Sequence, residues 1–125
     1  MKCEVVIGAN YGDEGKGQTT YVVCRRHEKP IVVMTNGGCQ RGHTVDVDGF
    51  RHIFHHFGSG TPLGCPTYFP ATYFMNPMQY VKEYHELEGH GMRPDAYRSE
   101  KCVMQFPSDA IVNQILEKSR QNTNS

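Results

Sequence analysis

Short apolar runs and a helical pattern alternate over the first 35 residues of the chain. Residues 3–8 (CEVVIG) and residues 29–35 (KPIVVMT) are mainly apolar and rich in β-branched side chains, so each run predicts a buried strand. Residues 16–27 lie between them and predict a helix with Thr20, Val23, Cys24 and His27 on one face. A strand, a helix and a second strand in this order predict a right-handed βαβ unit with parallel strands.

The middle of the chain predicts a β-hairpin. Residues 44–57 flank Asp48 and Gly49, and an Asp-Gly pair between alternating polar and apolar residues is the strongest short hairpin signal. Residues 58–66 predict a loop. Residues 67–75 (TYFPATYFM) predict a strand, which Pro70 would confine to a sheet edge or interrupt.

Two helices and a strand are predicted toward the C-terminus. Residues 76–91 predict a helix capped by Asn76, begun by Pro77 and ended by Gly89. Its inward face would hold Tyr80, Val81, Tyr84 and Leu87. Residues 101–106 predict a strand, and residues 108–120 predict a helix capped by Ser108. That helix would turn Ile111, Val112, Ile115 and Leu116 inward, ahead of a polar, frayed tail.

The composition indicates one globular domain, residues 1–125, without an internal boundary. Thirteen basic and thirteen acidic residues cancel, so no global field favours nucleic acid or an anionic membrane as a partner. No apolar run approaches the roughly 20 residues of a membrane span, and the N-terminus lacks the apolar stretch of a signal peptide. We therefore expect a cytoplasmic protein. Its five cysteines contain no CxxC pair, which favours free thiols over a disulfide framework or a zinc site.

Two glycine-rich loops, residues 8–17 and residues 36–44, directly follow the first two predicted strands. Because ligands bind outside the carboxyl ends of the strands in an α/β sheet, we expect these loops to lie side by side.

The first loop is similar to a phosphate-binding loop without matching its usual spacing. Gly12, Gly15 and Gly17 would let the backbone approach an anion at a helix N-terminus, and Lys16 adds a positive charge. The pattern GxxxxGKS or GxxxxGKT fails, however, because Gly17 replaces the hydroxyl residue that ligates magnesium. Asp13 is then the candidate metal ligand. The alternative is an ordinary glycine-rich turn that carries surface charges.

Histidines supply the remaining candidate chemistry. His43 in the second loop is either a solvated side chain or, beside a phosphate loop, a group that stabilises a transferring phosphoryl group. His52, His55 and His56 in the second hairpin strand are interpreted as a polar face or substrate lining, with a metal cluster as the alternative.

The sequence VVIGANYGDEGKGQ, followed by NGGCQRGHTV, resembles the N-terminal signature of the adenylosuccinate synthetases. The resemblance is dense there and continues thinly over essentially the whole chain. It implies a P-loop-NTPase-like α/β fold, incomplete in this chain, with a mostly parallel sheet, a βαβ phosphate-loop unit and a hairpin insertion. It also implies GTP-dependent, Mg²⁺-assisted ligation of aspartate to IMP in the AMP branch of purine biosynthesis.

The resemblance further implies roles for individual residues. Asp13 would remove the N1 proton of IMP so that O6 attacks the γ-phosphate of GTP, and aspartate would then displace phosphate from 6-phosphoryl-IMP. His43 would be the acid and Lys16 the phosphate counter-charge, while Asp13 and the Gly42 carbonyl would ligate Mg²⁺. The implied GTP and phosphate contacts are Gly12, Asp13, Glu14, Gly15, Lys16, Gly17, Gln18, Gly42, His43 and Thr44. The implied IMP contacts are Asp13, Glu14, Gly15, Lys16, Gln40, Arg41, Gly42 and His43.

The chain departs from the family pattern at three points. Gln40 and Arg41 precede GHT where relatives commonly read NAGHT, which leaves IMP and dGMP both open as substrates; a dGMP-using relative would make N6-succino-2-amino-dAMP. Asp13 favours IMP, because the dGMP-using relatives often lack it. Gln18 replaces a common lysine.

The third departure is length, because family enzymes are much longer. The guanine-reading motif, a second IMP loop and the aspartate-binding loop are absent, so we expect a fragment of a longer, homodimeric enzyme or a truncated relative. A non-catalytic nucleotide- or phosphate-binding module is the alternative. A generic P-loop NTPase is disfavoured by the loop spacing and by the lack of a clear Walker-B aspartate.

Overall fold

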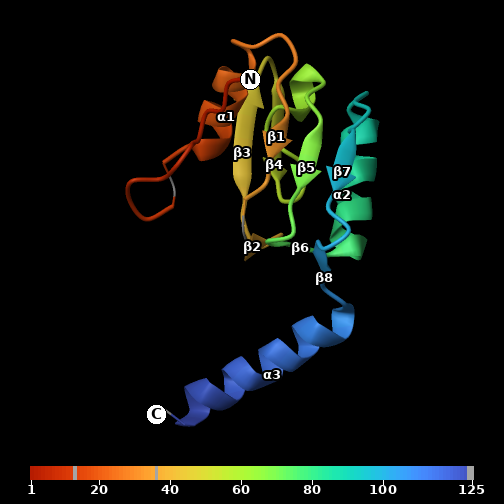
Figure 1. The fold of residues 1–125 in the computed structure, drawn as a ribbon. Coiled ribbons are helices and arrows are strands. Elements are labelled where there is room, and N and C mark those ends of the chain that lie inside the picture. Colours follow the sequence, from red (N-terminus) through yellow and green to blue (C-terminus); the bar gives the residue numbers. More distant parts are fainter. Residues whose placement is uncertain (13, 36, 124–125) are drawn as a thin grey trace.

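The protein is a mixed α/β structure, described here from a computed structural model that covers residues 1–12, 14–35 and 37–123 (Figure 1). Three α-helices and a short 3-10 helix are interleaved with eight short strands among these residues. The helices are α1 (Lys16–Cys24), α2 (Pro77–Gly89) and α3 (Pro107–Thr123), and the 3-10 helix is Thr61–Leu63. The strands are β1 (Val32–Val33), β2 (Gly37–Gly38), β3 (His43–Val47), β4 (Phe50–Phe54), β5 (Thr67–Phe69), β6 (Tyr73–Met75), β7 (Ala96–Arg98) and β8 (Val103–Met104).

The strands form two small parallel sheets and one antiparallel hairpin. The sheet orders are β1-β5-β7 and β2-β6-β8, and every neighbouring pair in them is parallel. The predicted fold class, a mostly parallel α/β structure with a hairpin insertion, is confirmed. Pro70 interrupts the predicted strand 67–75 and divides it into β5 of one sheet and β6 of the other.

The hairpin of β3 and β4 is formed as predicted. Asp48 and Gly49 adopt positive φ angles of 49° and 78°, the backbone that a two-residue turn of the I′ type requires. The register sets Val45 opposite His52 and His43 opposite Phe54. Val45 and Phe54 are completely buried in a core that also holds Tyr21 of α1 and Leu87 of α2. The hairpin therefore shares one core with α1 and α2.

Helix α2 confirms the predicted cap and most of the predicted face. The Asn76 side chain accepts a hydrogen bond from the Gln79 N–H at 3.1 Å. Leu87 is completely buried, whereas Val81 is 50% exposed and does not belong to the inward face. Glu83, with 3% exposure, takes that place instead.

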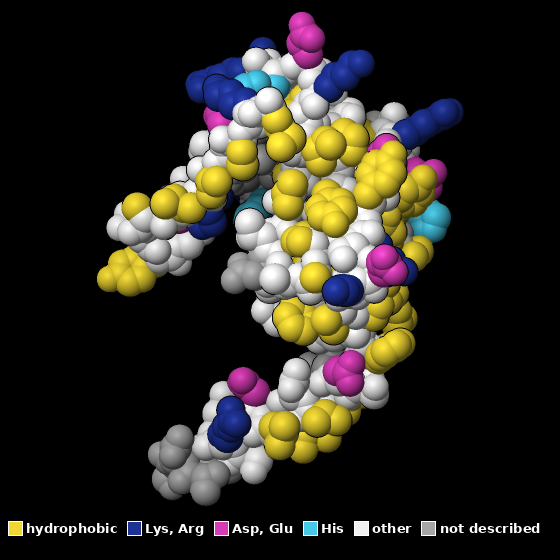
Figure 2. Space-filling view, viewed as in Figure 1, with side chains coloured by type: hydrophobic (Ala, Val, Ile, Leu, Met, Phe, Trp, Pro, Cys, Tyr) yellow, Lys and Arg dark blue, Asp and Glu magenta, His cyan; other side chains and the backbone are white. Residues whose placement is uncertain are grey.

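The predicted first strand is wrong. Residues 3–8 form no strand, and Val5 and Ile7 are 72% and 80% exposed. An apolar run favours burial, but a strand forms only where a neighbour accepts its hydrogen bonds. The first strand among the described residues is β1, which has only two residues, follows α1 and pairs with β5, so the predicted βαβ unit lacks its first strand there. Figure 2 shows apolar side chains along this exposed segment.

The C-terminal helix α3 is formed, but its apolar side is not packed. Ile111, Val112, Ile115 and Leu116 are 51% to 61% exposed, so their predicted inward orientation is wrong. Figure 1 shows that α3 extends away from the sheets, which agrees with these exposed fractions. Strand β7 was not predicted from the sequence. Among the described residues, no helix has the length and apolar character needed to cross a membrane.

Candidate functional site

The first glycine loop ends at the N-terminus of α1. Gly12 and Gly15 adopt φ angles of 102° and 76°, the left-handed region that favours glycine, and Gly15 is the N-cap of α1. The helix therefore begins at Lys16, as expected for a phosphate loop. Asp13, the predicted base and metal ligand, lies outside the described residues.

The Glu14 carboxylate is hydrogen-bonded within the first glycine loop. Glu14 Oε1 accepts hydrogen bonds from the backbone N–H groups of Asn10 and Gly12, at 2.6 and 3.2 Å. Lys16 Nζ lies 3.0 Å from Glu14 Oε2 and donates to the Gly12 carbonyl at 2.9 Å. The hydrogen bond from Lys16, together with those from the backbone, lowers the pKa of Glu14 to about 2. The predicted contacts of Glu14 with GTP and IMP stay a prediction.

Gly17 brings α1 into backbone contact with β3. A β-carbon added at Gly17 would lie 2.6 Å from the Thr44 carbonyl oxygen and 2.8 Å from the carbonyl carbon of His43. One residue along, Gln18 Oε1 accepts a hydrogen bond from the Asp46 N–H at 3.0 Å. A lysine could not accept this bond. The two glycine loops are therefore adjacent, as predicted, although the packing of α1 on β3 causes it rather than two neighbouring parallel strands.

His43 stands at the start of β3, half-buried between two cations. Burial lowers the pKa of His43, and the positive charges of Arg41 and Lys16 lower it further. These three side chains come from both loops and together favour an anion over a cation. His43 was predicted to lie in a loop, but it is the first residue of β3. The strand fixes the position of its Cα.

The remaining predicted residues lie around His43. Arg41 donates from Nε to the Gly38 carbonyl at 3.4 Å, and its guanidinium carbon lies 5.1 Å from the centre of the Tyr73 ring. Gln40 is exposed in the turn that follows β2. Gly42 lies against β4, since an added β-carbon would be 2.9 Å from Ile53 Cγ2. Within the described part of the chain, no group of three histidine, cysteine or acidic residues could hold a metal ion, so the predicted alternative of a histidine cluster is not formed.

Sequence reasoning missed a buried carboxylate that organises the histidines. Glu83 of α2 accepts hydrogen bonds from the backbone N–H groups of His55 and His56, at 3.0 and 2.8 Å. Its oxygens also lie 3.6 Å from His52 Nε2 and from His56 Nδ1. Burial alone would raise the pKa of Glu83, but the nearby imidazoles of His52 and His56, together with the hydrogen bonds from the backbone, outweigh it and lower the pKa to about 2. Its spacing from Tyr80 and Leu87 on α2 was the available signal.

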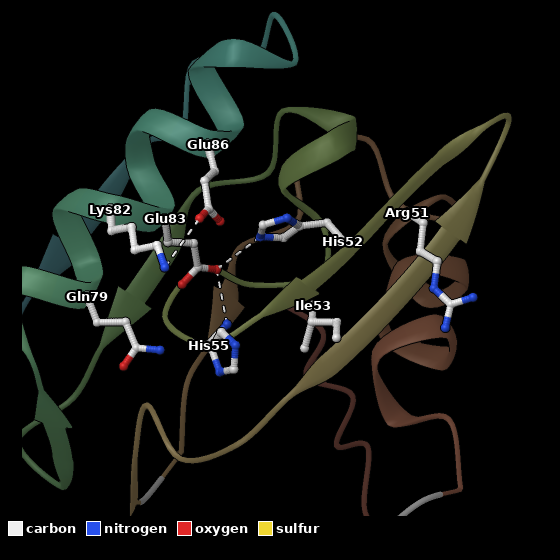
Figure 3. Close-up of a pocket in the computed structure, with 8 residues that line it drawn as sticks. All are labelled: Arg51, His52, Ile53, His55, Gln79, Lys82, Glu83 and Glu86. Carbon is white, nitrogen blue, oxygen red and sulfur yellow. Dashed lines mark hydrogen bonds and ion pairs between the residues drawn. The ribbon is translucent and has the colours of Figure 1, made fainter.

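Beside Glu83 lies an open cavity of about 410 Å³ between α2 and β4 (Figure 3). Figure 3 shows Glu83 reaching from α2 toward His52 and His55. The cavity is lined by Arg51, His52, Ile53, His55, Gln79, Lys82, Glu83 and Glu86. His55 thus lies between this cavity and the second glycine loop.

Comparison with known proteins identifies the family of this chain. The sequence model of the family described as adenylosuccinate synthetase matches residues 5–125. The adenylosuccinate synthetase of Pyrenophora tritici-repentis is 34% identical over 94% of this chain, and that of Methanococcus maripaludis strain C7 is 27% identical over 98% of it. The chain spans only 28% and 35% of the length of these two relatives.

A solved structure is similar as well. The fully ligated adenylosuccinate synthetase of Plasmodium falciparum superposes with a TM-score of 0.80 over 94% of this chain, at 22% identity, and the match spans 27% of that protein. This similarity concerns the fold. The chain belongs to the adenylosuccinate synthetase family.

Proposed function

We propose that this chain carries the phosphate- and purine-contacting loops of a GTP-dependent, Mg²⁺-assisted ligase that joins aspartate to IMP through 6-phosphoryl-IMP. The observation that carries the proposal is the backbone contact between Gly17 and His43. It sets the N-terminus of α1, with Lys16, beside a half-buried imidazole that Arg41 also influences. Phosphoryl transfer needs mainly alignment and charge stabilisation, and the adjoining position of these groups supports both roles.

The proposal assigns roles to individual residues. Lys16 and the first amides of α1 hold phosphate oxygens, and His43 donates a proton toward the transferred group. Asp13 takes the N1 proton of IMP. Bound Mg²⁺ would offset phosphate charge, with Asp13 and the Gly42 carbonyl as its protein ligands.

A second candidate substrate is dGMP. Gln40 and Arg41 lie next to His43 in the chain, and the cation–π contact of Arg41 with Tyr73 keeps a bulky guanidinium in this segment. Such a group changes both the charge and the room available to a purine. A third candidate is a module that binds nucleotide or phosphate without ligation. For a full-length enzyme we propose small-molecule substrates and a homodimer.

Calorimetric titration of the chain with GTP plus Mg²⁺, with IMP and with dGMP separates these readings. Binding of IMP or dGMP supports a working half-site and identifies the preferred nucleotide. Binding of GTP alone favours the non-catalytic module. Absence of binding by all three nucleotides contradicts the proposal for this chain.

A further inference from the structure

The ring of His55 connects the end of β4 to the second glycine loop. Its Nδ1 atom lies 2.6 Å from the carbonyl oxygen of Arg41 and 3.0 Å from that of Cys39. Carbonyl oxygens only accept hydrogen bonds, so Nδ1 carries the proton and donates it to both. One imidazole N–H thereby holds two carbonyl groups of residues 39–42.

The backbone of His55 is itself fixed on both sides. Its N–H donates to the buried Glu83 carboxylate at 3.0 Å, and its carbonyl accepts a hydrogen bond from the Tyr73 hydroxyl at 2.9 Å. The next residue is held in the same way, because the His56 N–H donates to Glu83 and His56 Nε2 accepts from the Asn76 N–H at 3.1 Å. These hydrogen bonds therefore hold the backbone from which the His55 ring extends.

Tyr73 contacts both His55 and Arg41. The Tyr73 hydroxyl donates to the His55 carbonyl, while its ring lies under the Arg41 guanidinium at 5.1 Å. The Arg41 carbonyl in turn accepts from His55 Nδ1. Both the main chain and the side chain of Arg41 are thus positioned by groups on β6 and at the end of β4.

We propose that His55 is a positioning residue that holds residues 39–42 in the conformation in which Gln40 and Arg41 contact the purine nucleotide. The nucleotide contact rests on the proposed function, whereas the hold on the segment does not. His55 acts through the segment and touches no substrate. Loss of its donor leaves the fold of the hairpin in place and loosens the segment.

Two amide substitutions test this assignment of the donor atom. In H55N the amide nitrogen is bonded to Cγ, as Nδ1 is, so it can reach the same carbonyls. In H55Q the amide nitrogen lies one bond further out and cannot reproduce that position. H85N removes an exposed α2 histidine that pairs with Glu88 on the same helix, and serves as the matched control.

Two readouts are measured for each variant in a C3S background, which removes an exposed thiol. The first is the rate at which a disulfide reagent labels Cys39, a half-buried thiol in the held segment, located by peptide mass spectrometry. The second is the affinity for the nucleotide that the parent chain binds. We expect H55Q to raise the rate and weaken the affinity about five- to tenfold, as for one lost hydrogen bond. H55N and H85N should stay close to the parent.

Equal labelling rates in H55N and H55Q, whether fast or slow, overturn the proposal. If the parent chain binds no nucleotide, the proposed function fails for this chain, and labelling alone decides whether His55 holds the segment. If H55Q labels faster but binds nucleotide like the parent, the segment is held by His55 but does not contact the nucleotide, which overturns the proposed link to binding.

Discussion

The backbone of Gly17 on α1 touches the backbone of His43 on β3, with only 2.8 Å between the β-carbon position of the first and the carbonyl carbon of the second. No side chain mediates this contact. The distance between the phosphate loop and the candidate acid is therefore set by a glycine, and it changes if residue 17 gains any side chain.

G17A should destabilise the protein by about 1–3 kcal/mol, since the added methyl group overlaps backbone atoms that must move. It should also weaken GTP binding, because α1 and Lys16 shift away from His43. Urea unfolding and calorimetry measure the two effects. The control is G89A at the end of α2, where an added β-carbon meets nothing within 4 Å. A neutral result for G17A would contradict the close approach.

E83Q should remove a stabilisation that depends on pH. The pKa of Glu83 falls from its ordinary value of 4.5 to about 2 in the folded protein, so its contribution is present above pH 4.5 and is lost as the pH falls toward 2. At about 1.4 kcal/mol per unit, the contribution is up to about 3 kcal/mol. Urea unfolding from pH 7 to pH 2.5 should show a steeper loss of stability for the parent than for E83Q.

E88Q on the exposed side of α2 is the control for that experiment. Glu88 pairs with the exposed His85, so the unfolding free energy of E88Q should follow that of the parent over the whole pH range. Parallel pH profiles for E83Q and the parent would show that Glu83 does not titrate at a lowered pKa.

E14Q should strengthen binding of inorganic pyrophosphate. The Glu14 carboxylate neutralises Lys16 and occupies the N–H groups of Asn10 and Gly12. Removing its charge frees Lys16 for an incoming anion, so affinity should rise several-fold and fall more steeply with salt. Calorimetry at two salt concentrations measures this. The control is E4Q, which removes the charge of a surface carboxylate beside Lys2. Weaker binding by E14Q would instead assign Glu14 a direct part in holding the ligand.

I115S should change the free energy of unfolding by less than about 0.5 kcal/mol, because Ile115 is 61% exposed on a helix side that packs against nothing in the described structure. L87A removes a completely buried side chain from the main core and should cost about 2–5 kcal/mol. Urea unfolding of both variants makes the comparison. A large loss in I115S would show that α3 folds back onto the body.

Local features of the sequence determined the parts of the fold that depend on neighbouring residues alone. The Asp48–Gly49 turn, the Asn76 cap and the break at Pro70 all follow from backbone preferences of single residues. The backbone of the first loop requires glycine at two positions, because only glycine adopts the φ angles of Gly12 and Gly15 at little cost. Family membership followed from the two motifs together.

Tertiary structure decided what the apolar runs and the histidines do. Residues 3–8 and the apolar side of α3 have the patterns of buried elements, yet burial requires a second surface, and the described structure places none over them. In the same way, His52, His55 and His56 looked equivalent in the sequence. Glu83, 27 residues further along than His56, distinguishes two of them from His52 by accepting the backbone N–H groups of His55 and His56. The sequence pattern indicates which kinds of contact a residue can make, and the tertiary structure decides which partner it contacts.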